Sequence, residues 1–233
     1  IVVLNTAMVM ETGFLDDEAI DAALWIGMPG SRGCGSLGNI LAGEVNPSGH
    51  LADTYAYDLT TAPSYYNFGD YTYSNFDGNN KYVYYQEGIY VGYRYYETAA
   101  ADGYIDYDTT VQFPFGYGLS YTNFDWEVEK TELGDIGGTI NIDVKVTNTG
   151  DVAGKDVVEL YYAAPYDPAE EIEKSSVVLG AFEKTNTLKP GESETVTLTM
   201  NVDDMASYDY KNNKCYVLSA GDYEFRLQTD SHN

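Results

Sequence analysis

Residues 33–38, Gly-Cys-Gly-Ser-Leu-Gly, form the most conspicuous chemical pattern in the sequence. They match G-x-G-x-x-G, in which glycines let the backbone approach a dinucleotide pyrophosphate, and Asp53 lies downstream as a candidate ribose ligand. However, residues 28–32 separate the pattern from the nearest strand candidate at 23–26, and the helix it would open is only about two turns long. Since the pattern often occurs by chance, we favour a packing turn over a nucleotide site.

Histidines and carboxylates point to no hydrolase triad. His50 and His232 have no serine, cysteine or acidic partner at a recognisable spacing, so ordinary surface histidines are favoured. Most carboxylates lie in polar turns or on the solvent faces of predicted strands, where a charge needs no partner. Glu87 is the exception, because Arg94 and several tyrosines lie near it in the sequence. We favour a structural Glu87–Arg94 ion pair that holds a loop over acid–base chemistry by Glu87.

The stretch 55–96 holds 13 of the 24 tyrosines and few aliphatic residues, which predicts a long irregular excursion. Tyrosine rings can stack on sugar rings while their hydroxyls form hydrogen bonds, so this stretch could line a carbohydrate-binding mouth. The same properties enrich tyrosine at protein interfaces, and a domain-docking surface is an equal alternative. The candidate sugar-stacking residues are Tyr65, Tyr66, Phe68, Tyr71, Tyr73 and Phe76.

The cysteines predict neither a metal site nor a disulfide framework. Cys34 and Cys215 are far apart and form no CxxC or Cys/His spacing, so two free thiols, buried or half-buried, are expected. We expect no metal and no cofactor. Unpaired thiols and the lack of an Asn-x-Ser/Thr acceptor favour the cytoplasm of a bacterium, although an export signal upstream would allow secretion.

Charge and length exclude several classes of partner. The net charge of −25 opposes nucleic acids and anionic membrane surfaces, which bind through Lys and Arg. No apolar run approaches the roughly 20 residues of a membrane span. Residues 1–5, Ile-Val-Val-Leu-Asn, have the pattern of a buried strand and not of a signal peptide, so we expect the natural chain to begin further upstream.

The elements that position these residues divide into two domains. Residues 1–121 predict an α/β domain with a mostly parallel sheet: strands at 1–5 and 23–26, helices at about 17–24 and 36–42, and a turn at 46–49. Residues 122–233 predict a seven-stranded antiparallel β-sandwich, because apolar residues alternate with polar ones, as in 139–146, between regular turn signals. The expected strands are 123–130, 139–148, 156–164, 177–184, 192–200 and 221–228.

Four ordered segments carry a family resemblance: ALWIGMPG at 23–30, ILAGEVNPSGHL at 40–51, EGIYVGYRYY at 87–96 and FPFGYGLSYT at 113–122. With them the sequence resembles the C-terminal half of the α/β sandwich domain and the fibronectin type III-like domain of glycoside hydrolase family 3. It departs from the family pattern at 31–35, where SRGCG replaces a QeGG block, and at Ala52, which replaces a proline. The tyrosine-rich form resembles permuted bacterial members, in which the catalytic barrel follows the fibronectin-like domain.

The resemblance implies retaining hydrolysis of terminal β-linked glucosyl residues, with an Asp nucleophile on a TIM-like barrel and a separate acid/base. It places both outside this chain, so no catalytic residue is assigned here. Glu87, Tyr93 and Arg94 are expected to be structural or interdomain residues. The expected partners are the barrel and the upstream α/β strands, with a homodimer left open. The alternatives are a non-catalytic carbohydrate-binding or surface module and a nucleotide-binding module at 33–38.

Overall fold

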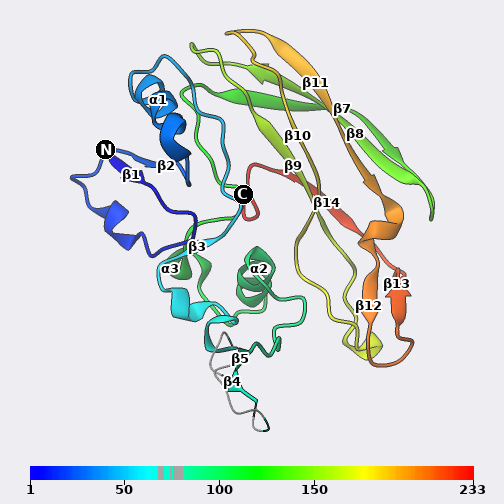
Figure 1. Ribbon diagram of the computed structural model, residues 1–233. Coiled ribbons are helices and arrows are strands. Elements are labelled where there is room, and N and C mark those ends of the chain that lie inside the picture. The colour runs from blue at the N-terminus through cyan, green and yellow to red at the C-terminus, as the bar shows by residue number, and fades with distance from the viewer. Residues whose placement is uncertain (68–70, 74, 76–80) are drawn as a thin grey trace.

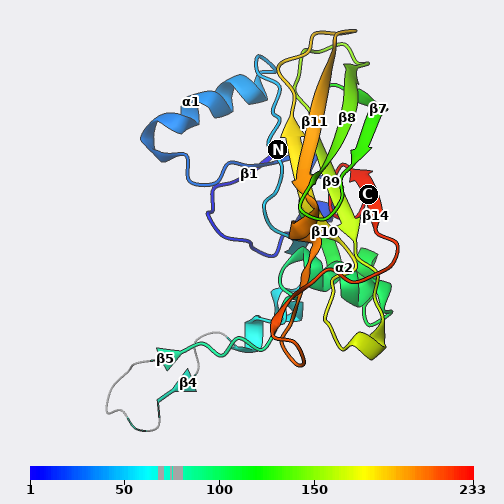
Figure 2. The same ribbon diagram turned by 90° about the vertical axis from the view of Figure 1, so that its right-hand side faces the viewer.

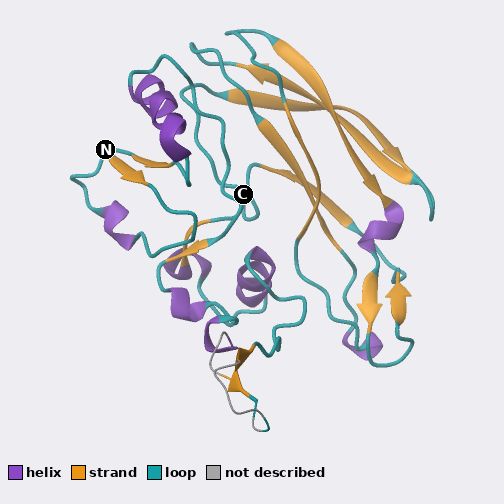
Figure 3. Ribbon diagram, in the orientation of Figure 1, coloured by secondary structure: helices purple, strands orange, loops and turns teal. Residues whose placement is uncertain are grey.

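The computed structural model describes residues 1–67, 71–73, 75 and 81–233. An α/β part, drawn in blue to green, lies beside a sandwich of long strands, and the C-terminus returns to the junction between them (Figure 1). Helices lie mainly in the α/β part, and long strands form the sandwich (Figure 3). No described helix is long and apolar enough to cross a membrane.

The α/β part begins with two parallel strands, β1 (Val2–Leu4) and β2 (Ala23–Trp25), which confirms both predicted strands. The predicted helix at about 17–24 is wrong. The 3-10 helix η1 (Gly13–Asp16) ends just before this segment. The segment begins with a turn, in which the Asp17 carboxylate accepts a hydrogen bond from the Ala19 N–H, and its last two residues belong to β2. A helix of only eight residues is marginally stable, whereas pairing with the neighbouring strand β1 provides hydrogen-bond partners for the backbone around Leu24.

The first long helix, α1 (Gly30–Leu41), begins six residues before the predicted start. Pro29 caps it, as expected of a residue that fixes φ at a helix start, and the Gly33 N–H donates to the Pro29 carbonyl. The glycines at 33, 35 and 38 therefore lie inside the helix. A dinucleotide fingerprint needs them in the loop that precedes a helix, so the structure contradicts both the nucleotide site and the packing turn.

The middle of the chain forms a small layer under α1. Strand β3 (Tyr55–Ala56) pairs with β6 (Val111–Phe113), and the helices α2 (Tyr93–Ala101) and α3 (Tyr107–Thr110) cover it. Ala56, Tyr96 and Val111 form its core. The predicted irregular excursion at 55–96 therefore ends at Tyr93, where α2 begins. Short elements fill its first part: η2 (Leu59–Thr61), η3 (Tyr65–Asn67), β4 (Tyr71–Thr72) and β5 (Lys81–Tyr82).

The sandwich confirms the predicted antiparallel architecture, with six strands instead of seven. Its sheets have the orders β11-β8-β7 and β10-β9-β14. Alternation on β8 is as expected: Ile140, Ile142, Val144 and Val146 are buried. The strands are β7 (Phe124–Leu133), β8 (Thr139–Asn148), β9 (Val157–Ala163), β10 (Val178–Lys184), β11 (Ser193–Asn201) and β14 (Glu224–Gln228). The prediction missed a hairpin, β12 (Ser207–Asp209) and β13 (Cys215–Val217), because strands of three residues are too short to show an alternating pattern. The domain boundary at 121/122 stays a prediction.

Strand β9 is buried on both faces. Val158, Leu160 and Tyr162 belong to the sandwich core. Glu159 and Tyr161 point to the opposite face, where an ordinary sandwich strand meets water, yet they are 5% and 0% exposed. The α/β part covers this face, so the second sheet of the sandwich is also the floor of the junction between the two parts.

Candidate functional site

Tyr93, at the start of α2, is the central aromatic residue of the junction. Its ring stacks on Phe115 at a centroid distance of 4.6 Å and meets the edge of Tyr161 at 6.2 Å. Its hydroxyl accepts a hydrogen bond from the Leu179 N–H of β10 at 3.0 Å. Two of the family-like segments, 87–96 and 113–122, thus meet on the sandwich.

Glu159 lies beneath the segment 113–122. Its carboxylate accepts a hydrogen bond from the Tyr161 hydroxyl at 2.6 Å, and the Gly116 backbone passes directly over it. Burial, which disfavours the charged form, raises the Glu159 pKa from 4.5 to about 7, the hydrogen bond from Tyr161 partly offsets this effect, and the nearby Asp230 adds to it. Burial, together with the Glu159 carboxylate, also raises the Tyr161 pKa.

Asn46, in the segment 40–51, connects three parts of the chain. Its amide N–H groups donate to the Ser120 hydroxyl at 3.0 Å and to the Ala153 carbonyl at 3.2 Å, and its carbonyl accepts from the Tyr121 N–H at 2.8 Å. Ala153 belongs to the sandwich, so this one side chain joins two family-like segments to the second domain.

We expect Asn46→Ala to lower the free energy of unfolding of the intact protein by about 2–3 kcal/mol, because it leaves several half-buried partners unpaired. Urea denaturation measures the loss. Asn39→Ala, which removes an exposed amide from α1, is the matched control and should change stability by less than about 0.5 kcal/mol. Equal effects of the two substitutions would contradict the role of Asn46.

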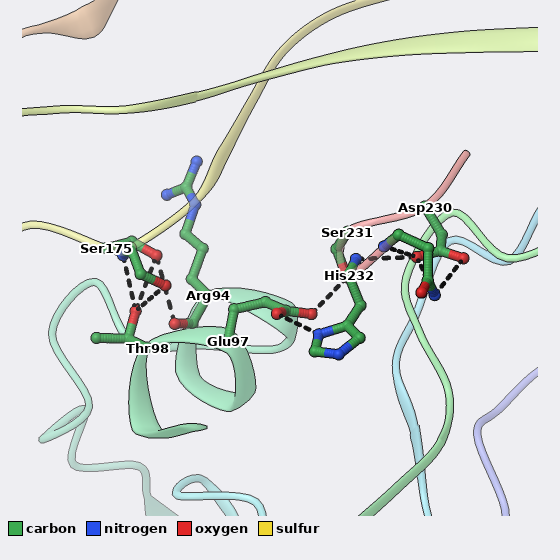
Figure 4. Close-up of polar contacts among 9 residues, drawn as sticks. Arg94, Glu97, Thr98, Ser175, Asp230, Ser231 and His232 are labelled. Atoms are coloured by element: carbon green, nitrogen blue, oxygen red, sulfur yellow. Dashed lines mark hydrogen bonds and ion pairs between the residues drawn. The ribbon is translucent and has the colours of Figure 1, made fainter. Parts of the chain in front are cut away.

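A second polar cluster joins α2 to the last residues of the chain (Figure 4). Glu97 is 8% exposed and accepts from the Ser231 hydroxyl at 3.0 Å, while its other oxygen lies 3.0 Å from His232 Nδ1. The His232 ring stacks on Tyr107 at 3.7 Å. A cavity of about 790 Å³ opens beside this cluster, with Glu97, Tyr107 and His232 in its wall.

The expectation of an ordinary surface histidine without an acidic partner is therefore wrong for His232. His232 has an acidic partner 135 residues away along the chain, and His50 bonds through Nδ1 to the Gly116 carbonyl. Only the packing of the two parts brings Glu97 and His232 together. Ser231 bonds to Glu97 and not to His232, so the cluster lacks the order of a nucleophilic triad and acts as a clamp.

The predicted Glu87–Arg94 ion pair is also wrong. The two side chains make no ion pair within the described residues, because Glu87 lies before a turn and Arg94 lies on the helix that follows it. The Arg94 side chain points away from Glu97 (Figure 4), and its backbone carbonyl accepts from the Ser175 hydroxyl. Glu87 Oε2 is buried without a hydrogen-bond partner in the described part of the protein.

An apolar groove of about 750 Å³ lies beside β1, β2 and α1. Trp25 is 41% exposed and Leu119 71% exposed in this groove. Parallel sheets normally have both faces covered, so two exposed parallel strands beside an apolar groove form an incomplete layer. Further apolar residues line it: Leu4, Leu15, Ile20, Leu24, Ile26, Leu37 and Ile40.

The tyrosine arm, which we define as residues 65–67, 71–73 and 81–85, extends away from the rest of the molecule (Figure 2). Tyr65 and Tyr66 pack edge to face at 5.1 Å, and Tyr71 and Tyr73 pack against Tyr82 at 5.4 and 5.0 Å. The structure thus places four of the six candidate sugar-stacking residues on the arm and away from the junction. Phe68 and Phe76 lie outside the described residues.

Both cysteines are free and exposed, so the expectation of buried or half-buried thiols is wrong. Cys34 lies on α1 and Cys215 on the β12–β13 hairpin. The described residues contain no group of three or more His, Cys, Asp or Glu that could hold a metal ion.

Comparison with known proteins agrees with the fold. Residues 1–93 match the Glycosyl hydrolase family 3 C-terminal domain, and residues 156–231 match the Fibronectin type III-like domain. The chain belongs to glycoside hydrolase family 3. This membership confirms the resemblance carried by the four segments, three of which meet at the junction.

Individual family 3 relatives match along almost the whole chain. A beta-glucosidase from Ruminococcus albus is 38% identical over 99% of this chain, and beta-glucosidase B from Emericella nidulans is 34% identical over 97%. The crystal structure of a beta-glucosidase from Paenibacillus barengoltzii covers 100% of this chain at 40% identity with a TM-score of 0.85. The chain spans about a quarter of these proteins: 22%, 25% and 24% of their lengths.

Sequence reasoning missed Glu159, Tyr161, Gly116 and Glu97 of this family 3 chain as junction residues. A weak signal was available for two of them. The segment 157–162, Val-Val-Glu-Leu-Tyr-Tyr, is apolar or aromatic on both faces apart from Glu159, which is typical of a strand that is buried on both sides. No sequence signal links Glu97 to residues 231–232.

Proposed function

We propose that the protein containing this chain is a retaining exo-acting β-glycosidase that hydrolyses terminal β-D-glucosyl residues. The observation that carries the proposal is the match of the whole chain to one quarter of a beta-glucosidase structure. In this proposal the chain is the non-barrel portion, which shapes and supports the active site. The nucleophile and the acid/base, about 5–5.5 Å apart in a retaining enzyme, belong to the rest of the protein.

The apolar groove supports this division of labour. In the proposal, upstream strands of the α/β domain complete the layer begun by β1 and β2, and the catalytic barrel lies against it. Burial of the exposed Trp25 and Leu119 side chains would contribute about 25 cal/mol per Å² of apolar surface. The junction then has a mechanical role: it holds the sandwich rigidly behind the α/β layer, so that the layer can position the active-site loops.

The intact protein is expected to hydrolyse p-nitrophenyl β-glucoside, and NMR should detect β-glucose as the first product. Trp25→Asp, which places a charge in the groove, should lower activity and stability together by uncoupling the domains. Tyr216→Asp, on the exposed β12–β13 hairpin, is the control and should leave both unchanged. A folded, monodisperse intact protein that is inactive on β-glucosides would contradict the proposal.

We also propose a bacterial cytoplasmic location. The exposed, unpaired Cys34 and Cys215 support it, because thiols stay reduced in that compartment. The similar proteins come from both bacteria and fungi, so the bacterial source is part of the proposal. Fractionation of cells with an antibody against the protein tests it, and enzyme in the periplasm or medium would contradict it.

A further inference from the structure

The tyrosine arm exposes several aromatic side chains that belong to no hydrophobic core in the described part of the chain. Its exposed rings cover neither the junction nor a described core. Large exposed aromatic patches mark binding sites, because they cost free energy in water. The exposed side chains are Tyr65 (54%), Tyr66 (73%), Tyr73 (51%), Tyr82 (37%), Tyr84 (57%) and Tyr85 (84%).

The rings of the arm are ordered by strand geometry. Tyr71 of β4 lies directly opposite Tyr82 of β5, and their rings stack at an interplanar angle of 26°. Tyr73 is two residues beyond Tyr71, so it projects to the same face and packs on Tyr82. Three neighbouring rings thus form one face of the hairpin.

The chemistry of this face favours a neutral, hydroxyl-rich ligand. Residues 62–85 contain two aspartates and one lysine, so they are almost uncharged within a chain of net charge −25. A polyanion would be repelled by the rest of the chain, and so would a second copy of this protein. A pyranose presents an apolar face to stack on tyrosine and hydroxyls to bond with the phenol oxygens.

We propose that the tyrosine arm is a carbohydrate-binding surface that holds neutral β-linked gluco-oligosaccharides. The choice of β-linked glucans rests on the proposed function. The surface itself rests on the exposed rings, their common face and the local lack of charge. The proposal commits to the sugar-binding interpretation of the tyrosine-rich stretch, and an absence of sugar binding in the test below would favour domain docking.

The test uses the intact protein with its active site blocked by a 2-deoxy-2-fluoroglucoside, which labels retaining enzymes covalently. Isothermal titration calorimetry with cellohexaose then reports binding outside the glucose subsite that the label fills, and the arm variant identifies the part of that binding that depends on the arm. We expect binding by the blocked wild type and a loss of affinity of about tenfold or more in the double variant Tyr73→Ala/Tyr82→Ala, which removes two exposed rings of this face. Tyr208→Ala/Tyr216→Ala is the matched control, because these two exposed tyrosines also pack on each other on a hairpin, and it should bind as wild type does.

Two results would overturn the proposal: no heat of binding with the blocked wild type, or equal affinity in both double variants. A change from dimer to monomer in the arm variant, seen by light scattering, would also overturn it in favour of a second copy as the occupant. Failure of the fluoroglucoside to label the protein would count against the proposed function alone. Cellohexaose binding by the unlabelled protein, and its loss in the arm variant, would still test the arm.

Discussion

Gly116→Ala is expected to lower the free energy of unfolding by about 3–5 kcal/mol, the range of severe core substitutions. Gly116 has φ +87°, which L side chains rarely adopt. A methyl group there would lie 2.9 Å from Glu159 Oε1, closer still to Oε2, and 3.0 Å from the Asp230 Cα. The last contact is with backbone, which cannot rotate away. Backbone strain and collision therefore act together.

Gly191→Ala separates these two causes. Gly191 has a similar φ of +79°, but a methyl group there would meet nothing within 4 Å. It should cost only the backbone strain, about 1–2 kcal/mol. Guanidinium denaturation of the intact protein measures both variants, and the difference between them is the cost of the collision at the junction. Equal losses would show that the segment 113–118 moves away from the sandwich without resistance.

Glu159→Gln is expected to remove a fall in stability that the wild type shows as pH rises. The folded protein keeps a proton on Glu159 up to about pH 7, whereas the unfolded chain releases it near pH 4.5. Between these values each rise in pH favours unfolding, and above pH 7 the loss is complete. The free energy of unfolding that the wild type loses through this titration is about 3 kcal/mol. Glutamine stays neutral and still accepts a hydrogen bond from Tyr161, so the variant gains on the wild type by that amount between pH 4.5 and 8.

Denaturation curves for both proteins across that pH range measure the effect, since other titrating groups are common to both and cancel in the difference. Glu183→Gln, which removes an exposed carboxylate from the neighbouring strand β10, is the control and should give no such gain. Tyr161→Phe removes a hydrogen bond that lowers the Glu159 pKa, so this pKa should be higher in the variant. The stability of the variant should therefore continue to fall up to a higher pH than that of the wild type. A parallel pH dependence in wild type and Glu159→Gln would place Glu159 outside the buried junction.

The junction links these predictions to the proposed function. Family-like segments that look like surface loops in the sequence meet the sandwich through Tyr93, Gly116 and Asn46. If the chain supports an active site in the rest of the protein, variants that loosen this junction should reduce activity by misplacing the α/β layer. Their effect on catalysis would then follow their effect on stability, unlike that of a residue that contacts substrate.

Local patterns in the sequence determined the strands of the sandwich, the parallel pair at the start of the chain and the family. Alternation along β8 needs only neighbouring residues, because the side chains of a strand point to opposite faces in turn. Helix boundaries were less predictable. The segment 17–24 has a helical pattern, yet its last residues pair with β1 as part of a strand. Residues Gly30–Leu41 form a helix although four glycines lower their helix propensity.

Only the tertiary structure decided which polar groups are buried and which partners they have. Glu159 lies on the face of β9 that water would cover in an isolated sandwich, and it becomes a buried acid because the α/β part packs over it. Glu97 and His232 meet across 135 residues, and no local spacing encodes that contact. Burial and long-range pairing depend on how domains pack, and these in turn set pKa values and the cost of a single methyl group at Gly116.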